Sequence, residues 1–110
     1  MKKYESVIII NAKLDEKEIK DTIEKYKNMM QEFSGKEPKV DDLGEKKLAY
    51  EIKKNTTGYY AVFYFQSEPE NIYELERNYR IDDNVLKFMT VRMEEELKYN
   101  ESEEEDEEEY

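Results

Sequence analysis

The side chains best suited to chemistry in this sequence lie between residues 43 and 65. The first half of this stretch carries four lysines, and the second half is a block of tyrosine and phenylalanine joined to the first by a polar turn. The lysines are Lys46, Lys47, Lys53 and Lys54. Ammonium groups neutralise phosphates, and aromatic rings stack on bases. The stretch therefore predicts a surface that contacts an anionic partner.

Catalytic chemistry has few of its usual components in this chain. There are no cysteines and no histidines, which removes thiol catalysis, the commonest general base and the commonest metal ligand. Carboxylate pairs such as Asp41–Asp42 and Asp82–Asp83 are expected where 43% of residues are charged, and they fit turns or helix boundaries. The three glycines form no phosphate-binding loop. We expect no enzyme, no cofactor, no metal site and no small-molecule substrate.

Composition indicates one domain. A chain of 110 residues can form one compact core, and no apolar stretch approaches the ~20 residues that cross a bilayer. Lys2 and Lys3 lead directly into a strand-like segment, so no secretory leader is expected. The lack of cysteine is compatible with a reducing cytoplasm.

The acidic charge is concentrated at the carboxyl end. The net charge is −11, but residues 101–110 hold eight acids and no base, so the first hundred residues carry only −3. This composition predicts a folded domain over residues 1–97 and a disordered acidic tail over residues 98–110. The tail could simply add solubility, or it could mimic nucleic acid and shield the protein's own basic patch.

The first half of the chain predicts a strand and a helix. Residues 4–12 are β-branched and apolar on both faces, as in a central strand. A helix should begin after Asp15, with Glu18 completing a capping box, and end at Gly35. Its apolar stripe consists of Ile19, Ile23, Tyr26, Met30 and Phe33.

The second half predicts three strands and one helix. A long strand over residues 40–54 should place Leu48, Tyr50 and Ile52 in the core, and residues 55–58 supply turn chemistry. The strand 59–66 has large residues on both faces. A helix follows from residue 67 or 68, with Pro69 in its first turn and Ile72, Leu75 and Tyr79 buried. The last strand covers residues 85–93, where Leu86 and Phe88 alternate with Lys87, Met89 and Val91.

This order, β-α-β-β-α-β, is the split-βαβ or ferredoxin-like plan of the α+β class. The first and third strands should be central in a four-stranded antiparallel sheet, with both helices on one face. The other face stays open. Its predicted residents are Val7, Ile9, Tyr60, Val62, Tyr64, Met89 and Val91. An apolar patch of this extent indicates a partner, and self-association through the same face is the alternative.

Basic residues occur on the predicted hairpin, at the end of the second helix, on the last strand and at the start of the first. Besides the four lysines above, they include Lys2, Lys3, Arg77, Arg80, Lys87 and Arg92. Clustered bases favour contact with RNA. Solvated charges that protect sheet edges from aggregation are the structural alternative. The third strand lacks the sequence signature of the RNA-recognition module with stacking aromatics.

Several motifs occur together in this order and spacing: KKYE before an apolar strand, LGEKKLAYEIKK, the pair GYY, and LERNYRIDDNVLKFMTVR. Over residues 2–93 the chain thereby resembles the family of the sixth protein of the bacterial small ribosomal subunit. The resemblance implies a cytoplasmic, ribosomal protein that binds the central domain of 16S ribosomal RNA together with the eighteenth small-subunit protein. A ferredoxin-like regulatory or dimerisation domain that binds a small ligand is the alternative.

The resemblance also implies site residues. Bases that face RNA in the family match Lys2, Lys3, Lys46, Lys47, Lys53, Arg80, Lys87 and Arg92. Leu86 stands where some relatives carry a base. The partner protein is expected against the open sheet face, at Tyr60, Val62, Tyr64, Met89 and Val91.

Overall fold

The computed structural model describes residues 1–93 as a single sheet with two helices. Residues 94–97, which the sequence assigns to the domain, and the predicted tail 98–110 lie outside the described residues. The elements are β1 (Lys2–Asn11), α1 (Glu16–Ser34), β2 (Lys39–Ile52), β3 (Asn55–Ser67), α2 (Pro69–Ile81) and β4 (Val85–Met93). This order confirms the predicted split-βαβ plan.

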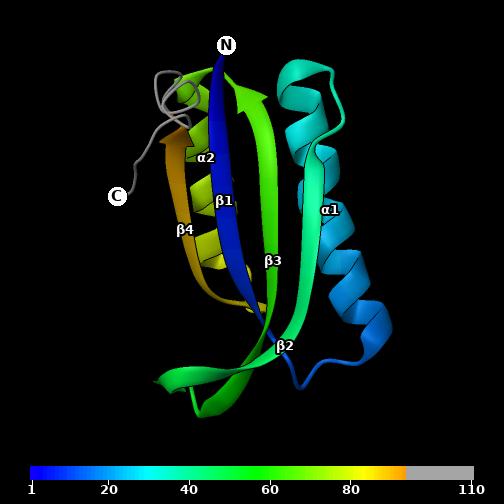
Figure 1. The fold of residues 1–110 in the computed structure, drawn as a ribbon, viewed down its shortest axis with the longest axis vertical. Coiled ribbons are helices and arrows are strands. Elements are labelled where there is room, and N and C mark those ends of the chain that lie inside the picture. Colours follow the sequence, from blue (N-terminus) through cyan, green and yellow to red (C-terminus); the bar gives the residue numbers. More distant parts are fainter. Residues whose placement is uncertain (94–110) are drawn as a thin grey trace, which may run out of the picture.

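The sheet is antiparallel with the strand order β2-β3-β1-β4. β1 and β3 are therefore central and β2 and β4 lie at the edges, as the sequence predicts. Both helices lie behind the same face of the sheet, and the opposite face carries no helix among the described residues (Figure 1). None of the helices in residues 1–93 has the length and apolar character required to span a membrane.

The predicted boundaries of α1 are confirmed by its caps. The Asp15 side chain accepts a hydrogen bond from the backbone N–H of Glu18, and the Glu18 carboxylate accepts one from the backbone N–H of Asp15. Gly35 ends the helix in the left-handed region, with φ 76°, where a side chain would be strained. The helix buries Ile19, Tyr26 and Met30 against the sheet.

The main core lies between the helices and the sheet. The rings of Tyr26 and Tyr79 meet with centroids 4.7 Å apart, and Phe63 from β3 is fully buried beside them. The Tyr79 hydroxyl is 2.7 Å from the Ser6 hydroxyl of β1. This hydrogen bond satisfies two buried polar groups that would otherwise oppose folding.

A second, smaller cluster lies on the open face. Ile9, Leu48 and Leu86 are buried there, with Ile52 and Tyr60 packed around them. The sequence predicts that Leu86 and Phe88 face the same side of β4, and this prediction is wrong: Phe88 packs against the main core and Leu86 belongs to the open-face cluster. The register between β1 and β4 shifts between Ile9 and Ile10, and the extra residue turns Leu86 to the open side.

The turn between β2 and β3 also differs from its prediction. It consists of Lys53 and Lys54, with φ 48° and 65°, and not of residues 55–58, which belong to β3. Ile52 lies opposite Asn55, so the loop has two residues, and both must take the left-handed conformation that suits such hairpins. The Asn55 amide donates to the carbonyls of Ile52 and Lys53 and holds this turn.

Asp82 joins the end of α2 to α1. Its carboxylate accepts hydrogen bonds from the Tyr26 hydroxyl at 2.6 Å and the Asn84 backbone at 2.9 Å, and it pairs with Lys25 at 3.3 Å. Burial alone raises the pKa of Asp82, but these three donors outweigh it and hold the pKa below its ordinary value. The carboxylate is thus a helix-boundary residue, as the sequence indicates, and a link between the two helices.

We expect Asp82→Asn to lower the free energy of unfolding by about 1–3 kcal/mol near pH ~7. Because the folded pKa is depressed, this stabilisation is present above the unfolded pKa of about 3.9 and is lost as the pH falls through the folded value. Urea unfolding of both proteins between pH ~7 and ~3 measures the difference. The exposed neighbour Asp83→Asn is the control. A difference that stays constant over this range contradicts the role of the carboxylate.

Candidate nucleic-acid and protein interface

The predicted cationic side chains fall at two ends of the sheet. The hairpin-end cations are Lys46, Lys47, Lys53, Arg80 and Lys87, and the amino-end cations are Lys2, Lys3 and Arg92. Lys3 and Ile9, which lies opposite Lys87, are separated by the rise of six β1 residues, about 20 Å. The two groups therefore lie at separate sites.

Three of the hairpin-end cations line one cleft. Lys53 comes from the β2–β3 turn, Arg80 from the last turn of α2 and Lys87 from β4. The cleft has a volume of about 290 Å³, and its other lining residues are Tyr79, Val85, Leu86 and Phe88. They come together because the ends of β2 and β3 extend past β1 and bend across the end of the sheet toward β4 (Figure 1). The cleft therefore combines three positively charged side chains with a mainly apolar lining.

Aromatic side chains hold two of these cations in place. The Lys87 ammonium donates a hydrogen bond to the Tyr50 hydroxyl at 2.6 Å and lies 5.2 Å from the centre of the ring. This hydrogen bond raises the pKa of Lys87 above its ordinary value, so the group stays charged at neutral pH. The Arg80 guanidinium lies 5.8 Å from the Phe88 ring and pairs with Glu76 at 3.8 Å.

Lys46 and Lys47 do not line this cleft. They lie opposite Gly58 and Thr57 in the hairpin, and both are exposed. Successive strand residues face opposite sides, so the two ammonium groups leave the hairpin in different directions. At most one of them can extend the charge of the hairpin-end cleft on a given side.

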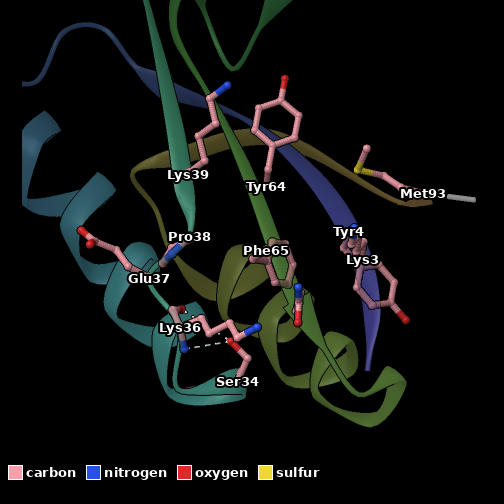
Figure 2. Close-up of a pocket in the computed structure, with 11 residues that line it drawn as sticks. Lys3, Tyr4, Ser34, Lys36, Glu37, Pro38, Lys39, Tyr64, Phe65 and Met93 are labelled. Atoms are coloured by element: carbon pink, nitrogen blue, oxygen red, sulfur yellow. Dashed lines mark hydrogen bonds between the residues drawn. The ribbon is translucent and has the colours of Figure 1, made fainter. Parts of the chain in front are cut away.

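Of the three amino-end cations, Lys3 alone lines a second cleft, of about 310 Å³. Lys3 lines it with two lysines that the sequence reasoning missed, Lys36 and Lys39 (Figure 2). The sequence contains a weak signal, since these lysines flank Pro38 just before an edge strand, but only the folded chain brings them to the start of β1. We name this site the amino-end cleft. Arg92 lies opposite Tyr4, whose side chain enters the main core, so Arg92 and Lys87 are on opposite faces of β4.

The five predicted partner-binding residues share the open face. Across the sheet, Val7 separates Val62 from Met89, Glu5 separates Tyr64 from Val91, and Ile9 lies opposite Tyr60. Their exposure differs widely: Met89 is 60% exposed and Val91 43%, whereas Val62 is only 7% exposed. The edge formed by β4 therefore offers the most accessible apolar surface.

Acidic groups border this face near Tyr64. Burial raises the pKa of Tyr64, and the carboxylates of Glu5 and Asp41 raise it further. Lys87 lies at the other end of the same face, beside Tyr60 and Met89. The open face thus has an apolar centre, with Lys87 at one end. At the other end, near Tyr64, the carboxylates of Glu5 and Asp41 lie together with the ammonium of Lys39. Within residues 1–93, no three carboxylate, histidine or cysteine side chains come together as a metal site.

Tyr50 corrects one prediction about the hairpin. The sequence places it in the core, but its side chain is 60% exposed, while Leu48 is only 7% exposed. Leu48 packs on Gly58, where a Cβ atom would collide with the Ile9 side chain. Because Gly58 has no side chain, Ile9 and Leu48 can pack against it, and the hairpin lies against the open face. Tyr50 remains exposed there and accepts a hydrogen bond from Lys87.

The fold and its cationic ends define a small α+β protein with two charged clefts and one apolar sheet face. A family model described as ribosomal protein S6 matches residues 3–92. The chain therefore belongs to the ribosomal protein S6 family, which confirms the resemblance read from its motifs.

Individual relatives agree with this assignment. The chain is 46% identical over 92 residues to a small ribosomal subunit protein bS6 of Helicobacter acinonychis, covering 84% of this chain and 65% of that one. It is 44% identical over 94 residues to the bS6 protein of Clostridium novyi, covering 86% and 99%. The crystal structure of 30S ribosomal protein S6 from Thermotoga maritima matches with a TM-score of 0.80 and 34% identity, covering 92% and 94%. The Helicobacter relatives are thus longer than the matched region.

The open-face cluster gives a matched pair of substitutions on one strand. We expect Leu48→Ala to lower the free energy of unfolding by about 2–4 kcal/mol, because it leaves a cavity beside Ile9 and Leu86. Tyr50→Ala removes an exposed ring and should cost less than about 1 kcal/mol. Urea denaturation measures both. Equal losses for the two variants contradict the assignment of Leu48 to this cluster.

Proposed function

We propose that this chain is a structural component of the small ribosomal subunit, located on cytoplasmic ribosomes, where it binds 16S ribosomal RNA together with the eighteenth small-subunit protein. Membership in the S6 family supports the ribosomal part of this proposal. The proposal of RNA contact is supported mainly by one observation: Lys53, Arg80 and Lys87 line the same cleft. No catalytic role is proposed.

RNA binding at the hairpin-end cleft would be mainly electrostatic. Each ammonium or guanidinium group that neutralises a phosphate releases bound counterions, so the affinity falls steeply with salt. One of the exposed hairpin lysines, Lys46 or Lys47, would extend the positive surface toward the backbone of a longer RNA segment. At the other end of the sheet, Lys3 on the open-face side and Lys2 with Arg92 on the helix side would form further contacts.

The partner protein would occupy the open face. Met89 and Val91 provide exposed apolar area on β4, and Tyr60 and Tyr64 provide half-buried rings beside it. Aromatic and methionine side chains are enriched in such interfaces. The carboxylates near Tyr64 favour a partner with basic side chains at that end.

The charge of the chain explains why RNA binding would require the partner. The first hundred residues carry a net charge of −3 and the whole chain −11, so long-range forces repel a phosphate backbone. A basic partner seated on the open face would reverse this sign near the RNA. Binding of RNA and of the partner should therefore be cooperative.

We expect Lys53→Gln with Lys87→Gln to lower partner-dependent affinity for a 16S RNA fragment roughly tenfold, and to reduce the dependence of log affinity on log salt by about 1–2. A filter-binding titration over a range of salt concentrations measures both effects. Lys17→Gln with Lys20→Gln is the matched control, because it makes the same charge change on the outer side of α1. If the two pairs have equal effects, the hairpin-end cleft is not the RNA contact.

We expect Met89→Lys to weaken binding of the eighteenth small-subunit protein at least about tenfold, because it places a charge in the apolar interface and repels a basic partner. Isothermal titration with the purified partner measures this loss. Tyr73→Lys adds the same charge at a side chain that is 83% exposed on α2, away from the open face, and should leave the affinity unchanged. An unaffected Met89→Lys variant excludes the β4 side of the open face as the docking site.

A further inference from the structure

The amino-end cleft is a cationic site that the hairpin-end contact does not use. Lys3, Lys36 and Lys39 line it, and the ammonium of Lys39 lies 5.6 Å from the centre of the Tyr64 ring (Figure 2). Among residues 1–93, Glu37 is the only carboxylate in this lining, and its side chain is paired with Lys27 at 2.9 Å. Lys36 and Lys39 therefore place two positive charges in the lining, beside one carboxylate that is already paired.

In the sequence, an acidic segment follows directly on a residue that lines this cleft. Met93, the last described residue, is also part of the lining. The residues that follow it, 94–110, contain eleven acids and one lysine, beginning with three consecutive glutamates. Fully extended, this segment spans at most about 60 Å, so its length does not limit which part of it can contact the cleft.

We propose that the acidic segment 94–110 binds the amino-end cleft of its own chain, with its carboxylates against Lys36 and Lys39. The covalent link at Met93 makes this an intramolecular contact, with an effective concentration in the millimolar range. The contact requires neither RNA nor the partner protein. A phosphate or another anion that approaches the same lysines must displace the segment.

The amino-end cleft is the nearer of the two cationic sites. β4 runs from the hairpin end, where Lys87 lies, to the amino end, where Met93 lies, a separation of six residues or about 20 Å. At the hairpin end, Lys87 already contacts Tyr50, and Arg80 already pairs with Glu76. The carboxylates of Glu5 and Asp41 beside Tyr64 oppose the acidic segment, so the contact is weak and sensitive to salt.

A spin label in the full-length chain tests the proposal directly. The protein has no cysteine, so Ser102→Cys gives one site for a nitroxide. The measured quantity is the paramagnetic broadening of backbone amide signals in the free protein. At about 0.01 M salt we expect the strongest broadening at residues 36–39 and 64–66. At about 1 M salt, where the screening length is about 3 Å, the broadening should fall at least about twofold.

Two pairs of variants separate a specific contact from simple proximity. Replacing the acids of residues 103–109 by their amides should reduce the broadening at least about twofold, as should Lys36→Gln with Lys39→Gln. Lys53→Gln with Lys54→Gln at the other end of the sheet should leave it unchanged. Broadening that is equal for the acidic and amide segments, or that is strongest at residues 53–54, overturns the proposal.

Discussion

The burial of β1 on both of its faces is the constraint on which the rest of the molecule depends. Ile8 and Ile10 are fully buried under the helices, while Ile9 between them is 9% exposed on the opposite side. Strands with apolar residues on both faces are typical of the inside of a sheet. β1 accordingly has β3 on one side and β4 on the other, and β2 lies beyond β3 at the far edge. The main core and the open-face cluster are then the two sides of one strand.

The hairpin-end cleft follows from the lengths of the strands. β2 and β3 extend beyond the end of β1, so their tip has no strand beside it and bends across the sheet (Figure 1). Gly58 permits this bend, because only a residue without a side chain fits against Ile9 there. Leu48 then joins the open-face cluster, and the turn at Lys53 arrives beside Arg80. The same packing that stabilises the hairpin therefore assembles its positive charge.

Local signals in the sequence predicted most of the fold. The capping pair of Asp15 and Glu18, the glycine at position 35 and the uniformly apolar first strand each specify one structure, so the element order and strand order were correct. The wrong predictions concern positions whose conformation depends on tertiary packing and not on local sequence. Leu86 faces the open side because β4 has an extra residue there, and strand alternation does not reveal a bulge. The turn lies at Lys53 and Lys54 and not at residues 55–58, because the buried Asn55 side-chain amide donates hydrogen bonds that stabilise it there. Lysine rarely adopts positive φ, so the sequence does not indicate this position.

The separation of charge within the domain explains how an acidic protein can still present sites for anions. Positive groups occupy the two ends of the sheet, whereas the carboxylates of Glu5 and Asp41 lie beside Tyr64 on the open face. At salt concentrations where the Debye length is about 8–10 Å, two sites about 20 Å apart act independently. The potential at each cleft is then set mainly by its own lysines. Under the proposed function, the net charge of −11 would oppose the long-range approach of a large anion, and the local arrangement of Lys53, Arg80 and Lys87 would decide where it binds.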